Sequence, residues 1–263
     1  MMDDRQTDEV ARALLEAEAS RRPVPPLTET YPDLDLDDAY AIQLAQVRLR
    51  RERGERVRGH KVGLTSLPMQ RMLGVDEPDF GHLWDGMFHL EHAPVPASSW
   101  IALRVEPEIA FVLARPLAGP GVTVADAVAA VDVVLPALEV VDSRVEDWRI
   151  GLLDTVADNA SAAGVVLGSR PTRLTDVDLR LVGCVLRRQG QVQQTGTGAA
   201  VLGSSLSSLV WLANTVGRWG TVLEAGHVIL PGSVTAAIPV RAGDTVTAEF
   251  GGPLGSVTAR FVD

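Results

Sequence analysis

The sequence predicts an α+β fold, with a mainly helical N-terminal region, residues 1–95, and a larger, strongly twisted β-rich core, residues 96–263. Apolar residues recur at helical spacing in the first 55 or so positions, whereas short runs rich in valine and leucine, separated by glycine and proline, follow from about residue 100. A parallel fold would alternate strands with helices of about 10 to 15 residues, and this second part shows only two helices among many strands. We expect the boundary in the loop between residues 90 and 100.

Two helices are expected in the N-terminal region. One covers residues 9–20, where apolar side chains recur at helical spacing. The second follows Asp37 and Asp38, whose carboxylates can cap a helix N-terminus. The four prolines within residues 21–35 exclude regular structure between the two helices and favour an ordered connection.

The C-terminal part is expected to consist mostly of strands. Two helices interrupt it: a short one near residues 124–130, and a longer one at residues 205–219 that is followed by Gly220 as its C-terminal cap. Strands are expected within six segments, residues 101–114, 131–144, 161–168, 180–196, 227–232 and 244–251.

Composition and charge exclude several classes of protein. The formal net charge is -10, and Glu52 and Glu55 interrupt the arginine-rich stretch 48–58, so no basic stripe is available to bind nucleic acid. The N-terminus is acidic and no run of about 18 apolar residues occurs, so we expect neither a secretory signal nor a membrane span, and a cytoplasmic location. Cys184 is the only cysteine, which excludes an intrachain disulfide and a Cys-rich zinc site.

Two glutamates in the first strand-like segment are candidates for chemistry. Glu106 and Glu108 are two residues apart, so their carboxylates leave the same face of an extended strand. Pro107, between them, cannot donate to a sheet ladder, which predicts an edge strand or a bulge where side chains can be directed into a cleft.

A third carboxylate, Glu139, lies in an otherwise apolar run. Burying it is costly unless a cation meets it. With five histidines that lack a zinc-site spacing, an oxygen-only site for a hard cation such as Mg²⁺ or Mn²⁺ fits better than zinc. On spacing alone, buried salt bridges from the glutamates to Arg104 or Arg144 remain an alternative.

Seven short motifs resemble the hydratase/decarboxylase branch of the fumarylacetoacetate-hydrolase-like superfamily, and they occur in the family's order over most of the chain. The motifs are G-H-K-V-G-L-T-S at 59–66, G-V-D-E-P-D-F-G-H-L at 74–83, R-V-E-P-E-I at 104–109, L-E-V-V-D-S-R at 138–144, D-T-V-A-D-N-A-S at 154–161, G-A-A-V-L-G at 198–203 and the Gly-Asp turn at 243–244. The resemblance implies a β-rich roll as the core and a divalent cation, Mg²⁺ or Mn²⁺. It assigns Glu106, Glu108 and Glu139 as the metal ligands.

The resemblance also assigns roles around the metal. It implies that Lys61 and Asp79 are catalytic, with Lys61 holding the substrate's carboxylate or enol oxygen and Asp79 transferring a proton. The backbone of Gly63 and Leu64 and the hydroxyl of Ser161 are the expected donors to the substrate carboxylate. The segment that ends at Ser161, D-N-A-S, also suits a helix N-cap, and both roles can coexist at a helix N-terminus.

The implied activity is that of a hydro-lyase, which adds water to a 2-hydroxy-2,4-dienoate and yields a 4-hydroxy-2-oxo acid in the degradation of aromatic or sterol rings. Related hydratases carry lysines where this chain has Arg149 and Gly151, so Arg149 keeps a substrate-binding charge and Gly151 removes a second one. Two alternatives stay open: a decarboxylase of 2-oxo-3-hexenedioate (4-oxalocrotonate) on the same fold, and a non-catalytic relative that binds metal and oxo acids. We expect a homo-oligomer that can associate with a decarboxylase or an aldolase of the same pathway.

Overall fold

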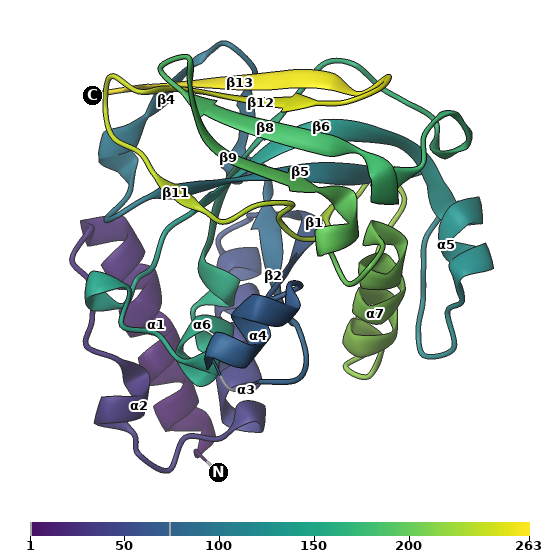
Figure 1. The fold of residues 1–263 in the computed structure, drawn as a ribbon. Helices are drawn as coiled ribbons and strands as arrows, with labels where there is room; N and C mark the ends of the chain where they lie inside the picture. The colour runs from purple at the N-terminus through teal and green to yellow at the C-terminus, as the bar shows by residue number, and fades with distance from the viewer. Residues whose placement is uncertain (1, 74) are drawn as a thin grey trace.

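Two β-sheets, packed one above the other, form the centre of the protein (Figure 1). The computed structural model describes residues 2–73 and 75–263. Within this part, the first sheet has eight strands in the order β2-β1-β10-β5-β6-β7-β3, with β11 paired to β5. Its strands are β1 (Val57–Gly63), β2 (Asp79–Trp84), β3 (Phe88–Leu90), β5 (Arg104–Leu113), β6 (Val131–Val141), β7 (Ala162–Leu167), β10 (Val228–Leu230) and β11 (Ile238–Pro239).

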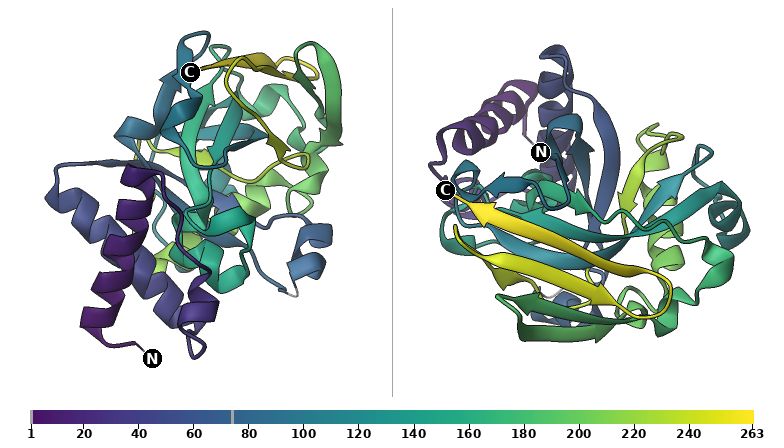
Figure 2. Two further views of the ribbon diagram at one scale, coloured as in Figure 1. Left: turned by 90° about the vertical axis from the view of Figure 1, so that its left-hand side faces the viewer. Right: turned by 90° about the horizontal axis from the view of Figure 1, so that it is seen from above.

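The second sheet covers β6 and β7 of the first sheet, as the view from above shows (Figure 2). Its five strands follow the order β4-β13-β12-β8-β9 in the described residues. They are β4 (Pro94–Pro96), β8 (Gly183–Arg188), β9 (Gln191–Thr197), β12 (Thr245–Phe250) and β13 (Gly255–Val262). The many antiparallel strands and the few helices between them confirm the predicted α+β class.

Helices lie below and beside the first sheet (Figure 1). The α-helices are α1 (Asp4–Ser20), α2 (Leu27–Thr30), α3 (Leu36–Glu52), α4 (Leu67–Leu73), α5 (Val124–Ala130), α6 (Leu152–Ala157) and α7 (Ser205–Gly217). The segment Gly198–Gly217, which includes α7, is apolar and long enough to cross a membrane, yet 44% of its apolar window is buried inside the protein. A core helix passes the same test, so this is weak support for a membrane span.

The two predicted N-terminal helices are confirmed as α1 and α3, with a difference in capping. Asp35, and not Asp37 or Asp38, is the N-cap of α3; its side chain accepts from the N–H of Asp38, whose own side chain reaches back to the N–H of Asp35. The expectation that the proline-rich connection lacks regular structure was wrong for Leu27–Thr30, which forms the single helical turn α2 directly after Pro26.

The first sheet draws strands from both sides of the predicted boundary at residue 95. β1, β2 and β3 precede that boundary and pair with β10 and β7, so the helical part of the N-terminal region ends with α3. This arrangement places Lys61 and Asp79, on β1 and β2, in the same sheet as the glutamates of β5 and β6.

Strand β5 is internal to the sheet, so the prediction of an edge strand was wrong. It pairs with β6 along its whole length and with β10 and β11 on its other side. On that side Pro107 falls between the residues paired to β11 and those paired to β10, where no ladder hydrogen bond from its nitrogen is needed.

In the C-terminal part α5 has the predicted bounds, whereas the C-cap of α7 is Arg218 and not Gly220.

Candidate active site and metal centre

The register of β5 and β6 brings the three predicted glutamates together. Glu106 lies directly opposite Glu139, and Glu108 follows two residues further along the same face of β5. One carboxylate oxygen from each of the three lies within 4.8 Å of the others. Glu108 and Glu139 are fully buried and Glu106 is partly buried, so this is not a solvated strand face.

The carboxylate oxygens of this cluster outnumber the donors around them. Glu108 Oε2 accepts from the N–H of Gly232 at 2.8 Å, whereas Glu108 Oε1 and both oxygens of Glu139 accept no hydrogen bond from any described residue. Burial, reinforced by the neighbouring carboxylates, raises the pKa of Glu108 well above its usual value, and burial raises the pKa of Glu139 to about 7. Unpaired, buried oxygen ligands of this kind fit a hard divalent cation.

Lys61 supplies one positive charge beside the cluster. Its Nζ lies 3.5 Å from Glu139 Oε1 and donates to the carbonyl oxygen of Ala160 at 3.0 Å. Burial alone would lower the pKa of Lys61, but the surrounding carboxylates outweigh it and raise the pKa. Ala160 sits in a left-handed turn, with φ of 51°, which directs its carbonyl at the ammonium. One ammonium cannot neutralise three carboxylates, which leaves room for a second cation.

Asp79 faces the same ammonium from the neighbouring strand. The β1–β2 register places it opposite Gly63, and its Oδ2 accepts from the hydroxyl of Thr155 at 3.3 Å. Burial raises the pKa of Asp79, and the charge of Lys61 reduces that rise. A side chain at position 63 would bring its Cβ within 2.2 Å of Asp79 Oδ1, so glycine is required there.

A cavity of about 390 Å³ opens beside these residues. Gly63 and Leu64 line it, as predicted, and Leu64 adopts a left-handed φ of 55°. Its other lining residues are Val62, Thr65, Ser66, Pro68, Glu106, Ala200, Ser233, Val234, Thr235 and Ala236. The sequence interpretation missed the hydroxyl residues of this lining, although the T-S of the first motif, residues 65 and 66, is a signal that could have found two of them.

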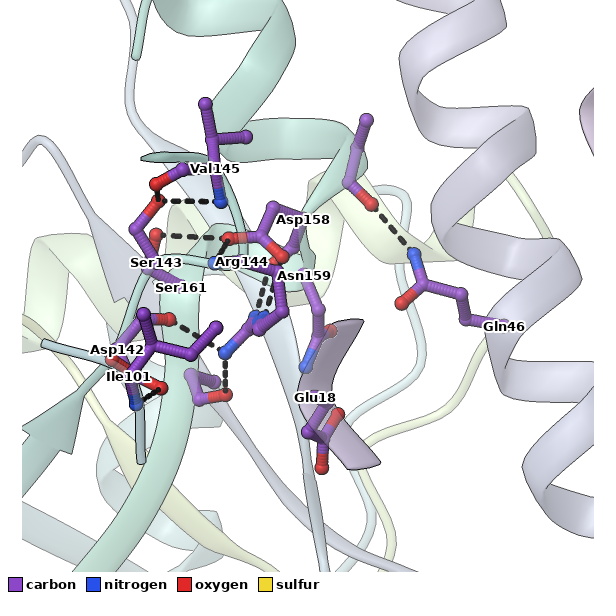
Figure 3. A network of polar contacts seen from close by, with 12 residues as sticks. Glu18, Gln46, Ile101, Asp142, Ser143, Arg144, Val145, Asp158, Asn159 and Ser161 are labelled. Atoms are coloured by element: carbon purple, nitrogen blue, oxygen red, sulfur yellow. Dashed lines mark hydrogen bonds and ion pairs between the residues drawn. The ribbon is translucent and has the colours of Figure 1, made fainter. Parts of the chain in front are cut away.

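The alternative of salt bridges from the glutamates to Arg104 or Arg144 is not what the described residues show. Arg144 is buried in a network of its own (Figure 3). Its Nε lies 2.6 Å from Asp158 Oδ1, and its other nitrogens donate to backbone oxygens. The guanidinium of Arg104 lies 4.2 Å over the ring of Trp148.

Ser161 belongs to the network around Arg144. Its hydroxyl donates to Asp158 Oδ2 at 3.5 Å, and it does not line the 390 Å³ cavity. The segment D-N-A-S follows α6, with Asp158 as the C-cap of that helix; Asp158 is also the N-cap of the single 3-10 turn Asn159–Ser161, but its side chain makes no capping hydrogen bond there. The contact between Ser161 and the substrate stays a prediction; the residue before Ser161, Ala160, binds Lys61 through its carbonyl oxygen.

Arg149 is likewise separate from the other predicted residues. Its guanidinium pairs with Glu29 and Glu146 at the surface, and it does not line the cavity. Gly151 is the N-cap of α6, and its N–H donates to Asp154 Oδ2 at 2.9 Å. The structure thus brings together the three glutamates, Lys61, Asp79, Gly63 and Leu64, with Ser161 directly after the Ala160 that binds Lys61. Arg149 lies apart from them at the surface.

The fold and the site together define an α+β enzyme in which a cluster of carboxylates could hold a divalent cation beside a cavity. The chain belongs to the fumarylacetoacetate (FAA) hydrolase family, because the family described as fumarylacetoacetate (FAA) hydrolase C-terminal matches residues 72–262. This confirms the family that the motifs predicted.

Relatives in the family resemble the chain over nearly its whole length. The 2-keto-4-pentenoate hydratase of Paraburkholderia xenovorans (strain LB400) is 46% identical over 260 residues, 99% of this chain and 96% of that protein. The 4-oxalocrotonate decarboxylase of Pseudomonas putida is 42% identical over 253 residues, 96% of each chain. A solved structure of 4-oxalocrotonate decarboxylase from Pseudomonas putida G7, complexed with magnesium and adipate, is 38% identical with a TM-score of 0.96, covering 100% of this chain and 99% of that one.

Proposed function

We propose that the protein is a divalent-cation-dependent hydratase that converts a 2-hydroxy-2,4-dienoate into a 4-hydroxy-2-oxo acid. The observation that carries this proposal is the cluster of Glu106, Glu108 and Glu139, with Lys61 and Asp79 beside it and with Glu106 lining an adjoining cavity. The intact cluster argues against a non-catalytic relative, and the 46% identity to a 2-keto-4-pentenoate hydratase supports this type of substrate.

Glu106, Glu108 and Glu139 would hold the cation, with Mg²⁺ or Mn²⁺ preferred because all three ligands are carboxylate oxygens. When bound, it acts as a Lewis acid that stabilises negative charge on the oxygens of a 2-oxo acid and its enolate. The N–H of Gly232 fixes the Glu108 carboxylate at 2.8 Å, so one ligand is oriented before any ion binds.

Lys61 and Asp79 would handle charge and protons. The Lys61 ammonium, already fixed by Ala160 and Glu139, binds the carboxylate or the 2-oxygen of the substrate. Asp79 moves a proton, so that O2 of the dienol loses one and C5 gains one, which gives a 2-oxo-3-enoate. Water then adds its oxygen to C4 and a proton goes to C3. Burial raises the pKa of Asp79, which favours a group that takes up and releases a proton.

The cavity lining favours a substrate with one carboxylate. Among its described lining residues there is no lysine, arginine or histidine, and apart from Glu106 the lining consists of apolar and hydroxyl residues such as Val234 and Thr235. A second carboxylate at the far end of a dicarboxylate would be buried without a cationic partner, which is costly. This lining favours hydration of a short monocarboxylate over decarboxylation of 2-oxo-3-hexenedioate.

Product identity tests the proposal. The Mg²⁺-loaded protein is incubated with 2-hydroxypenta-2,4-dienoate and, separately, with 2-oxo-3-hexenedioate, and the products are followed by NMR and by CO₂ release. We expect 4-hydroxy-2-oxopentanoate from the first substrate and little CO₂ from the second. CO₂ release without hydration of the monocarboxylate would assign the decarboxylase instead. The homo-oligomer, its association with a decarboxylase or aldolase, and the cytoplasmic location remain predictions.

A further inference from the structure

A second, larger cavity lies on the opposite face of the first sheet. Successive residues of a strand point to opposite faces, so His60 points away from the side on which Lys61 meets the glutamates. The cavity measures about 1130 Å³ and lies between α3, the ends of β1 and β2, and residues 219–227. None of its described lining residues also lines the 390 Å³ cavity, so the two are separate sites.

Two histidines with unused nitrogens line this cavity. His60 and His82 lie opposite each other on β1 and β2, with ring centroids 4.9 Å apart, and the ring of His227 is 5.5 Å from that of His60. His60 is 0% exposed and His82 is 2% exposed. Both ring nitrogens of His60 and Nδ1 of His82 lack a hydrogen-bond partner among the described residues. Buried polar atoms without partners are rare and require an explanation, such as a ligand.

Three arginines and three glutamates line this cavity, Arg48, Arg51 and Arg56 with Glu52, Glu55 and Glu224. Glu52 and Glu55, which also line it, are already paired with Arg48 and Arg50. The side chains of Arg51 and Arg56 form no ion pair with any described residue. Two guanidinium groups without an ion pair therefore lie at the cavity that the buried imidazoles line.

The chemistry of these groups favours an anion over a metal ion. Burial, together with the neighbouring imidazoles and Arg51, lowers the pKa of His60, and burial lowers the pKa of His82 to about 4, so both rings are neutral and each carries one N–H donor. Arg51 would repel a cation. In the part of the chain that is described, only the three glutamates bring ligand atoms within 4.8 Å of one another.

We propose that this cavity is a second ligand site, which binds the oxyanion head of a small organic acid, a carboxylate or a phosphate ester. Arg51 supplies the charge and His60 and His82 each supply an N–H donor to the anion. Leu44, Val47 and Trp219 line the same cavity and provide an apolar wall for the remainder of the ligand. The site does not depend on the reaction carried out at the metal centre.

Calorimetric titration of the full-length, Mg²⁺-loaded protein with hexanoate and with inorganic phosphate tests this site. Arg51→Gln removes the proposed cation from an exposed position, and Arg53→Gln, on the next residue but one and outside the cavity lining, is the matched control. We expect saturable binding of at least one probe, weakened at least tenfold by Arg51→Gln and unchanged by Arg53→Gln. The probe that binds distinguishes a carboxylate from a phosphate head group.

The NMR signals of ¹³C-labelled imidazoles locate the binding. His60 and His82 are identified from His60→Gln and His82→Gln, and their signals should shift with the probe in parallel with the heat. Equal affinity in Arg51→Gln and the wild type, or no binding of either probe, would overturn the proposal. It would also be overturned if the two signals responded only to dilution of the protein, since a second copy of the chain would then fill the cavity.

Discussion

Arg144 and two glutamates of the candidate metal centre, Glu108 and Glu139, are comparably buried, yet their surroundings differ. Each nitrogen of the Arg144 guanidinium donates to an oxygen of Asp158 or of the backbone, so this network is closed (Figure 3). Around Glu108 and Glu139, one backbone N–H and one ammonium face four carboxylate oxygens. A buried charged network whose donors and acceptors are all paired stabilises one conformation. The glutamates of the metal centre form an open cluster, because most of their oxygens lack a donor, and such a cluster can gain interaction energy by binding a ligand.

The strongest test of the comparison removes the open cluster. In the double variant Glu106→Gln, Glu108→Gln, two of three ligands lose their charge. Loss of a residue that only hydrogen-bonds to a metal ligand typically weakens metal binding by about 10- to 100-fold. Because this variant changes two of the ligands themselves, we expect Mn²⁺ binding to weaken by at least about 1000-fold. Calorimetry with Mn²⁺ measures it, and Glu16→Gln, an exposed residue of α1, is the control. Affinity like that of the wild type would contradict the assignment of the cluster as the metal centre.

Disrupting the Arg144 network should lower the stability of the fold and leave the affinity for Mn²⁺ almost unchanged. Arg144→Met leaves Asp158 buried without its cation, so the free energy of unfolding should fall by about 3 kcal/mol or more. Urea unfolding measures this, and Arg187→Gln, which breaks an exposed pair with Glu249, should lower it by less than about 1 kcal/mol. Mn²⁺ affinity of the folded Arg144→Met protein should stay within a few-fold; a large loss would mean that the two regions are not independent.

Asp79 tests the role of a group beside the open cluster that is not a metal ligand. Asp79→Asn keeps the shape of the side chain but removes its acid function, so kcat should fall by about 100-fold, the range typical of a lost general acid or base. The affinity for Mn²⁺ should change little. Unchanged kcat in Asp79→Asn would show that another residue transfers the proton.

The open cluster also predicts how stability depends on pH when metal is removed. In the fold the pKa of Glu139 is about 7, above its ordinary value of 4.5, so the folded protein keeps a proton that the unfolded chain loses. The free energy of unfolding of the metal-free protein should therefore fall as pH rises from about 4.5 to about 7, by roughly 1.4 kcal/mol for each unit of pKa shift. In Glu139→Gln this fall should be smaller by about 1.4 kcal/mol or more; an identical pH profile would show that Glu139 does not titrate in this range.

The smallest effect is expected at the surface. Arg149 pairs with exposed Glu29 and Glu146, and such pairs contribute about 0–1 kcal/mol. Arg149→Gln should leave KM for the dienoate within about twofold. A tenfold increase in KM would instead support the contact between Arg149 and the substrate that the sequence predicted.

The cluster of three glutamates could be predicted from the sequence because its signal is local. Glu106 and Glu108 alternate with Pro107 on one strand face, and Glu139 stands alone among valines and leucines, where an unpaired charge is costly. Lys61 and Asp79 depended on family motifs, since neither spacing nor burial pattern distinguishes a lysine or an aspartate of this kind from a surface residue.

The residues that could not be predicted depend on contacts between distant segments. Ser161 and Arg144 occur in motifs of the family, yet only the fold shows that both contact Asp158. His60 and His82 are 22 positions apart and show no ligand spacing; strand register alone places them face to face. For the same reason the sequence did not reveal that β1 and β2 join the strands of the metal centre.

The strands carry the metal centre, whereas turns and loops form much of the cavity beside it, with residues 64–66 following β1 and residues 233–236 preceding β11. Changes in these segments can alter which substrate fits while the glutamates keep their register. This separation allows new substrate specificities to arise by substitution in two short segments, while the residues of the metal centre stay unchanged. It offers a physical reason why proteins named hydratase and decarboxylase both remain more than 40% identical to this chain.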